Sequence, residues 1–498
     1  MGLKSFFGKP FAKAIHKQTV KWSQDPVGSQ KRVFDQLLGK GRHTRFGEDH
    51  KLNTVHNHAE FKQAVPVQDY EGLKPYVERI IKGERDVLWE GLPIYFAKTS
   101  GTTSGAKYIP ITKDSSPNHV NSARNSVLSY VHETKESRFL DHNMIFLSGS
   151  PILDMSGQVP TGRLSGIVNH HVPAYLRRNQ LPSFETNCIE DWETKLDAII
   201  EETVGKPMGM ISGIPPWVQM YFDRIMEREG KLIGEVFPKF SLFVHGGVNF
   251  EPYRNKLFES IGRKIPSIET YPASEGFIAY QDSQEKEGLL LLLNSGIFYE
   301  FIPTESYFDK NPVRLTIGEV EVGVNYAIVI NSNAGLWGYS IGDTVKFVST
   351  EPYRLIVTGR IKHFISAFGE HVIGEEVEGA MHEALKHFPE ADIIEFTVAP
   401  SINPEKGQSR HEWMVEFSTL PHDLEKFAVQ LDRELTKKNT YYDDLITGNI
   451  LKGLHVHVIK KDGFRSYMKS QGKLGGQNKV PRLSNDRKIA DELMKYAQ

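Results

Sequence analysis

The residues best suited to chemistry lie in a loop rich in glycine and hydroxyl side chains, within YFAKTSGTTSGAKYIPIT at residues 95–112. Glycines let the backbone turn sharply and point several N–H groups inward, while the hydroxyls and Lys107 add donors and positive charge. Such a loop can cradle phosphate oxygens, although an ordinary connecting loop is the alternative. It is not a Walker A loop, because three residues rather than four separate Gly101 from Gly105. The candidate residues are Ser100, Gly101, Thr102, Thr103, Ser104, Gly105 and Lys107.

A second group of polar residues follows a short strand in ETYPASEG, at residues 269–276. An aromatic ring, a hydroxyl and a carboxylate at a strand end could stack a base, contact a phosphate and hold Mg²⁺. The residues are Tyr271, Ser274 and Glu275. Taken alone, such a cluster is more often a solvated loop.

Charged residues in the last third of the chain complete the set. Asp343 follows Gly342 at a turn into a strand, where a carboxylate can accept hydrogen bonds from ribose hydroxyls; an ordinary turn aspartate is the alternative. Arg360 and Lys362 stand at a predicted domain boundary or in a charged linker. Lys479 lies in the glycine-rich segment GGQNKVPR, where it either reaches an anionic ligand or faces water.

Other catalytic patterns are missing from the sequence. It contains neither a G-x-S-x-G elbow nor an H-E-x-x-H helix. His455 and His457 alternate on one predicted strand, but no cysteine or carboxylate completes a metal site there. Without an obvious nucleophile, the chemistry is expected to rest on positioning and electrostatics at a phosphate.

The elements that must position these residues predict an α/β fold. Helices are expected over the first ~90 residues, including an amphipathic N-terminal helix, and over residues 215–230. The apolar runs NMIFLSGSP, KPMGMISG and KFSLFVHGG alternate with helices, which predicts a largely parallel sheet with ligands at the carboxyl ends of its strands. From Gly288 onward the strands follow one another without helices, which predicts a β-rich subdomain.

A domain boundary is predicted near Gly359, giving a large N-terminal domain of residues 1–359 and a small C-terminal lid domain of residues 360–498. The second domain is expected to be a compact α/β unit. Its predicted helices cover residues 375–388 and 422–438, and its predicted strands cover residues 391–400, 411–417 and 454–459.

Composition excludes several classes of protein. The 498 residues carry 60 Lys and Arg against 62 Asp and Glu, a net charge of −2, which argues against a nucleic-acid binder. Cys188 is the single cysteine, so an intrachain disulfide is impossible and a reducing cytoplasm is the expected location. No apolar run reaches the ~18 residues that cross a membrane.

In their order along the chain, the motifs resemble those of the adenylate-forming superfamily of acyl-CoA synthetases, luciferases and adenylation domains. Within it, the sequence is most similar to the Gretchen Hagen family of acyl acid amido synthetases, known from plant auxin and jasmonate conjugation. The similarity rests on TSGTTSGAKYIPIT, TYPASEG, GIFYEFIP, AGLWGYSIGDTV and QNKVPR, from residue 99 to residue 482.

The resemblance implies an ATP- and Mg²⁺-dependent ligase with a large domain and a small mobile one. It converts a carboxylic acid to an acyl-adenylate, and an amine, usually an amino acid, then forms the amide and releases AMP. The implied roles are phosphate binding by residues 100–105 and Lys107, adenine binding by Gly247 and Tyr271, α-phosphate contact by Ser274, Mg²⁺ binding by Glu275, ribose binding by Asp343 and Arg360, a hinge at Lys362, and a catalytic cation at Lys479.

Two departures keep alternatives open. Gly338 and Ser340 stand where the plant pattern has arginines, which puts any extra phosphate contact there in doubt. The segment GRIKHFISAFGEHVIGEEVE is closer to the broader superfamily, so an acyl-CoA ligase is one alternative function. The other is a nucleotide-binding protein without ligase activity. The sequence indicates neither the acid, the amine nor the oligomeric state.

Overall fold

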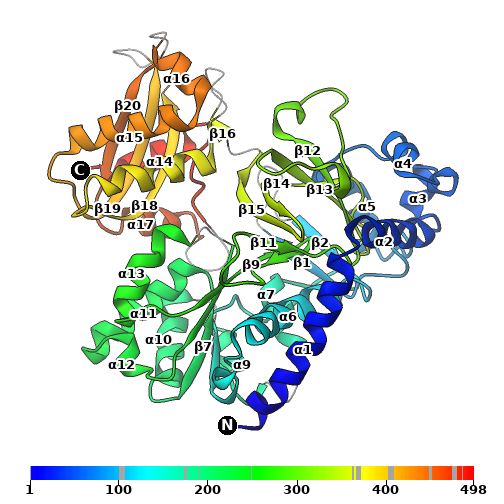
Figure 1. The fold of residues 1–498 in the computed structure, drawn as a ribbon, viewed down its shortest axis with the longest axis horizontal. Helices are drawn as coiled ribbons and strands as arrows, with labels where there is room; N and C mark the ends of the chain where they lie inside the picture. The colour runs from blue at the N-terminus through cyan, green and yellow to red at the C-terminus, as the bar shows by residue number, and fades with distance from the viewer. Residues whose placement is uncertain are drawn as a thin grey trace. The chain divides into compact units, whose positions relative to one another are not determined.

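The computed structural model describes residues 2–99, 107–172, 177–189, 191–247, 250–361, 364–365, 372–401, 409–447, 451–473, 479–484 and 486–498. The chain forms two compact units (Figure 1). The larger comprises Met1–Ile341 with Lys346–Ile356, and the smaller comprises Gly342–Val345 with Val357–Gln498. Among the described residues, no helix combines the length and the apolar character needed to cross a membrane.

The larger unit begins with helices, as the sequence predicts. They are α1 (Leu3–Ser23), α2 (Pro26–Gly41), α3 (Arg45–Asp49), α4 (His58–Ala64) and α5 (Tyr70–Ile81). Side-chain oxygens cap four of these helices by accepting backbone N–H groups of the first turn, through Asp25, Thr44, Asn57 and Asp69. A small sheet with the strand order β2-β1-β5-β4 follows. Its strands are β1 (Tyr95–Thr99), β2 (Lys107–Ile111), β4 (Asp154–Ser156) and β5 (Val159–Gly162).

The main sheet has the strand order β12-β13-β14-β15-β11-β10-β9-β8-β7-β3-β6. One part is parallel: β3 (Asn143–Phe146), β6 (Gln180–Leu181), β7 (Met208–Ser212), β8 (Leu242–Gly246) and β9 (Ser267–Ala273). One face packs on α10 (Trp192–Thr203), α11 (Pro215–Glu229), α12 (Ile233–Val236) and α13 (Glu251–Ile261). The other packs on α1 and α6 (Ser116–Thr134), and the short helices α7 (Leu164–His170) and α9 (Phe184–Asn187) lie in the connections. The predicted parallel sheet is confirmed.

The remaining strands of the main sheet run antiparallel where their pairing is described. They are β10 (Gly276–Tyr280), β11 (Leu289–Leu291), β12 (Ile297–Pro303), β13 (Asn325–Ser332), β14 (Tyr339–Thr350) and β15 (Tyr353–Arg360). This part confirms the predicted β-rich subdomain after Gly288. Nearly every residue of β10, β11, β12 and β13 is buried, so both faces of this part of the sheet are covered.

A buried polar network ties β12 to the N-terminal helices. Glu300 is fully buried on β12 and accepts hydrogen bonds from Arg314 at 3.0 and 2.6 Å and from Asn331 at 2.9 Å. His58 Nε2 of α4 lies 2.6 Å from the same carboxylate. Burial alone raises the pKa of Glu300, but its hydrogen bond to His58 and the Arg314 charge outweigh burial and hold the pKa at about 2.

The smaller unit is an α/β sandwich around the sheet β18-β19-β20. The strands are β18 (Asp392–Ser401), β19 (Arg410–Thr419) and β20 (Lys452–Ile459). One face carries α14 (Gly374–Lys386), α15 (Leu424–Lys438) and α16 (Thr440–Thr447), and the other carries α17 (Gly463–Ser470) and α18 (Lys488–Leu493). The short strands β16 (Phe364–Ile365) and β17 (Val372–Ile373) pair with each other. The sequence did not predict α16, α17 and α18, because helices this short offer few periodic positions.

Candidate active site

The predicted phosphate-binding loop is bounded by a β-hairpin. Residues 100–106, which include Ser100–Gly105, lie outside the described residues. On either side of them, Thr99 of β1 pairs with Lys107 of β2. Lys107 is half-buried, and its Nζ lies 6.0 Å from the centre of the Tyr70 ring. The hairpin therefore fixes where the loop leaves and re-enters the sheet, and it holds Lys107 at that point.

The two residues predicted to bind adenine lie at the carboxyl ends of neighbouring parallel strands. The register pairs Gly246 of β8 with Thr270 of β9. Gly247 directly follows the first of these residues, and Tyr271 directly follows the second. A Cβ on Gly246 would lie 2.3 Å from the Thr270 carbonyl oxygen, and Gly247 has a φ of +81°. Glycine is required at both positions, by close approach at the first and by backbone conformation at the second. The structure brings Gly247 and Tyr271 together.

Glu275, the predicted Mg²⁺ ligand, lies with Ser274 in the turn between β9 and β10. Both residues are partly exposed. The hydroxyl of Tyr339 on β14 donates a hydrogen bond to Glu275 Oε1 at 3.2 Å, and Tyr339 is itself 1% exposed. One oxygen of the carboxylate is thereby oriented by a buried, well-packed ring. A partly exposed carboxylate suits Mg²⁺, which is commonly bound through one or two carboxylates together with substrate phosphates.

A residue on α6 contacts the start of β10, directly after this turn. Asn118 donates to the Phe277 carbonyl oxygen at 3.0 Å and accepts from the Phe277 N–H at 2.6 Å. It therefore satisfies both backbone groups of a residue only two positions after Glu275. Neither Asn118 nor Tyr339 was predicted from the sequence to belong to the site. Tyr339 stands within the motif AGLWGYSIGDTV, which is the one signal that could have pointed to it.

The two residues that depart from the plant arginine pattern, Gly338 and Ser340, both pack closely against neighbouring residues. Gly338 has a φ of +56°, and a Cβ there would lie 2.3 Å from the Pro66 carbonyl oxygen. The Ser340 hydroxyl is buried and accepts a hydrogen bond from Tyr307 at 2.8 Å. A side chain at Gly338 would require a change in the surrounding backbone, and an arginine at position 340 would remove the hydroxyl that accepts from Tyr307.

In the smaller unit, the two predicted ribose-binding residues form an ion pair. Arg360 Nε lies 3.0 Å from Asp343 Oδ1, and the side chains are 47% and 19% exposed. The Ile361 N–H donates to the Gly342 carbonyl oxygen at 2.7 Å, so backbone pairing holds the two strands at this point. Lys362, the predicted hinge, lies outside the described residues.

Lys479 lies in the same unit and in the electrostatic field of this pair. The residue is exposed overall, yet loss of hydration around its ammonium group lowers its pKa. Arg360 and Arg482 lower that pKa further, whereas Asp343 and Glu378 raise it. Asp343, Arg360 and Lys479, which were all predicted to contact the nucleotide, therefore belong to the same unit.

A carboxyl group with a shifted pKa lies two residues before Tyr271. Burial, together with the charge of Glu251, raises the pKa of Glu269 to about 7 against the opposing charge of Arg254. In the parallel register Glu269 lies beside His245, whose pKa is lowered to about 3 by burial and by Arg254. The neighbour across the strand pair is therefore a neutral ring that does not stabilise the Glu269 carboxylate.

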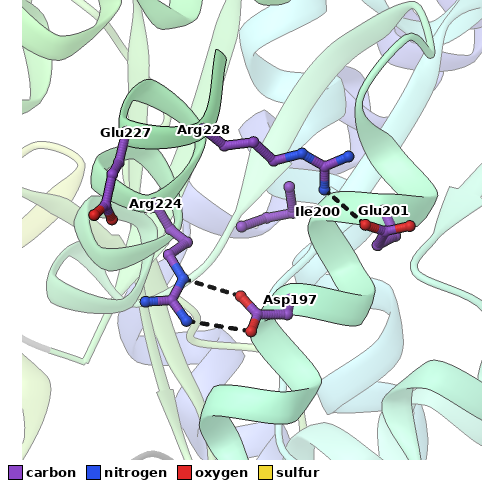
Figure 2. Close-up of a pocket in the computed structure, with 6 residues that line it drawn as sticks. All are labelled: Asp197, Ile200, Glu201, Arg224, Glu227 and Arg228. Carbon is purple, nitrogen blue, oxygen red and sulfur yellow. Dashed lines mark hydrogen bonds and ion pairs between the residues drawn. The ribbon is translucent and has the colours of Figure 1, made fainter. Parts of the chain in front are cut away.

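A surface groove between α10 and α11 is a separate feature (Figure 2). In it, Arg224 forms two hydrogen bonds with Asp197 at 3.0 and 3.2 Å, and Arg228 bonds Glu201 at 2.9 Å. These charges are paired with each other and exposed, and the groove contains none of the residues predicted for the nucleotide. Within the described residues, no group of three or more His, Cys, Asp or Glu side chains is arranged to hold a metal ion.

The fold matches those of solved enzyme structures. It superposes on AtGH3.15 acyl acid amido synthetase in complex with 2,4-DB, with a TM-score of 0.79 and 14% identity over 98% of this chain and 96% of that chain. It also matches a 2-hydroxyisobutyryl-CoA ligase in the postadenylation state, with a TM-score of 0.59 and 12% identity over 96% and 93% of the two chains. The predicted α/β fold, with a large N-terminal domain and a smaller C-terminal one, is confirmed by these likenesses.

The family follows from sequence models. The N-terminal, central and C-terminal domain models of the GH3 family match residues 15–183, 290–360 and 375–488. The chain belongs to the GH3 family, which confirms the predicted resemblance. Its relatives include indole-3-acetic acid-amido synthetase GH3.4 of Arabidopsis thaliana, 21% identical over 92% of this chain and 89% of that protein. Jasmonoyl–L-amino acid synthetase JAR4 of Nicotiana attenuata is also 21% identical, over 92% and 91%.

Proposed function

We propose that the protein is an ATP-dependent acid–amine ligase. It activates a carboxylic acid as an acyl-adenylate and transfers the acyl group to an amine, an amino acid by analogy with the named relatives. The observation that carries this proposal is the family match over all three domains, together with the placement of Gly247 beside Tyr271 at the carboxyl ends of β8 and β9.

The first step needs positioning more than proton transfer. The substrate carboxylate is already an anion, so its oxygen attacks the α-phosphorus of ATP without a base, and the bond to the pyrophosphate oxygen breaks. Bound Mg²⁺ would neutralise part of the negative charge of the phosphates. The demands on the protein are to orient the two reactants in line and to stabilise the charge that develops.

The predicted residues divide these tasks. Tyr271 stacks on the adenine above Gly247, while Asp343 and Arg360 bind the ribose. Lys107 binds phosphate oxygens together with residues 100–105, Ser274 contacts the α-phosphate, and Glu275 holds Mg²⁺ with its orientation set by Tyr339. Lys479 is the cation that stabilises the transferring α-phosphate, and Lys362 is the hinge.

In the second step, the amine nitrogen attacks the carbonyl carbon of the acyl-adenylate. The carbonyl–oxygen bond to AMP breaks, AMP leaves with the electron pair, and the nitrogen loses a proton. The substrates are small molecules rather than nucleic acids, and the enzyme is proposed to be cytoplasmic. We also propose a functional boundary between residues 1–359 and residues 360–498. The compact smaller unit takes in residues 342–345 and 357–359 in addition.

The test is pyrophosphate release from ATP with a panel of aromatic, aliphatic and hydroxy acids, each alone, with mixed amino acids and with CoA. Release that depends on one acid, together with an amide product, is the expected result. A CoA thioester would instead make the enzyme an acyl-CoA ligase. ATP binding without release for any acid would favour a nucleotide-binding protein without ligase activity.

A further inference from the structure

Three phenylalanines are exposed on the first turns of α1. Phe6 and Phe7 are each 62% exposed, and Phe11 is 42% exposed. The rings of Phe6 and Phe7 lie edge to face with centres 5.3 Å apart, and the Arg124 guanidinium lies 5.2 Å from the centre of the Phe11 ring. We call these three residues the Phe patch. Exposing large aromatic side chains to water is costly, so a patch of this kind indicates a contact surface.

This exposure is not the result of a loose helix end. The Gly2 and Ser5 N–H groups donate to the two oxygens of Asp141, at 2.8 and 3.1 Å. A Cβ on Gly8 would lie 2.9 Å from Leu140 Cδ1, so the helix approaches its neighbour closely. Further along, Ala12 is fully buried in a core cluster that includes residues of α6. Helices α1 and α6 lie side by side (Figure 1). The helix is docked on the protein body, and docking directs the Phe patch outward.

Helix α1 carries only positive charge. Between Leu3 and Ser23 the sequence has no Asp or Glu and carries the lysines Lys4, Lys9, Lys13, Lys17 and Lys21. The last four are spaced by four residues, which places them along one slowly turning stripe of the helix. Lys13, Lys17 and Lys21 are exposed.

Lys4 adds a cation that the fold leaves unsatisfied. Its Nζ is buried and has no hydrogen-bond acceptor among the described residues. Loss of hydration lowers its pKa; the charge of Asp141 opposes this and that of Arg178 adds to it. Lys4 therefore adds positive charge to this end of α1 without being exposed itself.

We infer that α1 docks the enzyme on an anionic lipid surface, with the Phe patch inserted at the headgroup level and the lysine stripe against the headgroups. Exposed aromatic rings beside a run of lysines have the chemistry that interfacial helices use. Contact with a second copy of the chain is disfavoured, because a twofold contact through the Phe patch would bring the two lysine stripes together. This inference does not depend on the proposed ligase activity.

The experiment is sedimentation of the full-length protein with vesicles of phosphatidylcholine, with and without phosphatidylserine. We expect binding that needs phosphatidylserine and is lost at high salt. Phe6→Ser with Phe7→Ser, and separately Lys13→Glu with Lys17→Glu, should each weaken it by about tenfold or more. The matched controls are Val429→Ser, at a 70% exposed residue of the smaller unit, and Lys231→Glu with Lys239→Glu, at exposed lysines away from α1.

Two measurements keep the inference falsifiable. The emission of Phe7→Trp should shift to the blue on adding anionic vesicles, and circular dichroism should show every variant folded. Equal binding by the Phe6→Ser/Phe7→Ser protein, or no binding by the wild type, would overturn it. So would wild-type self-association in vesicle-free sedimentation that the phenylalanine substitutions abolish, because the patch would then be a contact between copies.

Discussion

Asp343 and Arg360 meet across two strands of one hairpin, with Arg360 Nε 3.0 Å from Asp343 Oδ1. The Arg360 side chain is 47% exposed, whereas that of Asp343 is 19% exposed. An ion pair with a solvent-accessible partner contributes only about 0–1 kcal/mol to stability. Substitution there should therefore report on nucleotide binding rather than on folding.

Asp343→Asn should raise the KM for ATP by about 10–100-fold, because a charged acceptor for ribose hydroxyls is lost. The measurement is ATP-dependent pyrophosphate release together with direct nucleotide titration. A matched control is Asp282→Asn. Asp282 accepts two hydrogen bonds, at 2.9 and 2.8 Å, from Arg354, which lies on β15 as Arg360 does. Wild-type ATP affinity in Asp343→Asn would remove Asp343 from the ribose site.

Tyr339→Phe should weaken the apparent affinity for Mg²⁺ by about three- to tenfold, because Glu275 loses the hydroxyl that orients it. Glu275→Gln should have the larger effect, since it removes the charge itself. The readout is the Mg²⁺ dependence of adenylation. Tyr307→Phe, which deletes a comparable hydroxyl contact to Ser340, should leave that dependence unchanged. Identical Mg²⁺ curves for wild type and Glu275→Gln would show that Glu275 does not bind the metal.

Lys479→Ala should slow adenylation by about 10²-fold or more and leave ATP binding nearly intact, as expected for a contact made in the transition state. Single-turnover formation of acyl-adenylate separates this effect from binding. Lys488→Ala, at an 88% exposed lysine of the same unit, is the control. Normal adenylation by Lys479→Ala would exclude Lys479 from the mechanism.

Glu269 should make the larger unit less stable as the pH rises. Its pKa is about 7 in the folded protein against 4.5 for the ordinary group, so the protonated form is favoured by folding. That stability is complete below about pH 4.5 and is lost as the pH rises through 7. Glu269→Gln should therefore gain on the order of 1–2 kcal/mol relative to wild type at pH 8, and little at pH 5. Denaturation midpoints measure this, and a constant difference across that pH range would contradict it.

Glu300 should have the opposite dependence. Its pKa is held at about 2, below the ordinary 4.5, so the stability it contributes is present above pH 4.5 and is lost as the pH falls toward 2. Glu300→Gln leaves Arg314 with a buried unpaired charge and should destabilise the protein by about 3–5 kcal/mol at neutral pH. Glu287→Gln, at an exposed glutamate, is the control. A loss no larger than that of the control would show that the network is dispensable.

The sequence predicted the parts of the fold that depend on local pattern. Apolar runs ending in glycine predicted β3, β7 and β8, and their alternation with helices predicted the parallel sheet. The family resemblance assigned both Gly247 and Tyr271 to the adenine, and the structure places them on neighbouring parallel strands. The helix at residues 215–230 ends as expected, with Gly230 in a left-handed conformation after Glu229.

Contacts between distant residues could not be predicted in this way. Tyr339 and Glu275 are 64 residues apart, and Asn118 and Phe277 are 159 apart. A lone polar residue within a helix carries no mark of the backbone groups that it will meet. The ion pair of Asp343 with Arg360 depends on the pairing of β14 with β15, which follows from tertiary structure rather than from either motif.

The smaller unit is not a continuous stretch of chain, because residues 342–345 belong to it while residues 346–356 belong to the larger one. A genetic crossover after residue 360 would therefore transfer Lys479 to a new partner but leave Asp343 and Arg360 behind. Recombination between relatives at that point would keep the two residues proposed for the ribose together with the larger unit. The lysine proposed as the catalytic cation would be exchanged independently, and chimeric enzymes should be designed around that division.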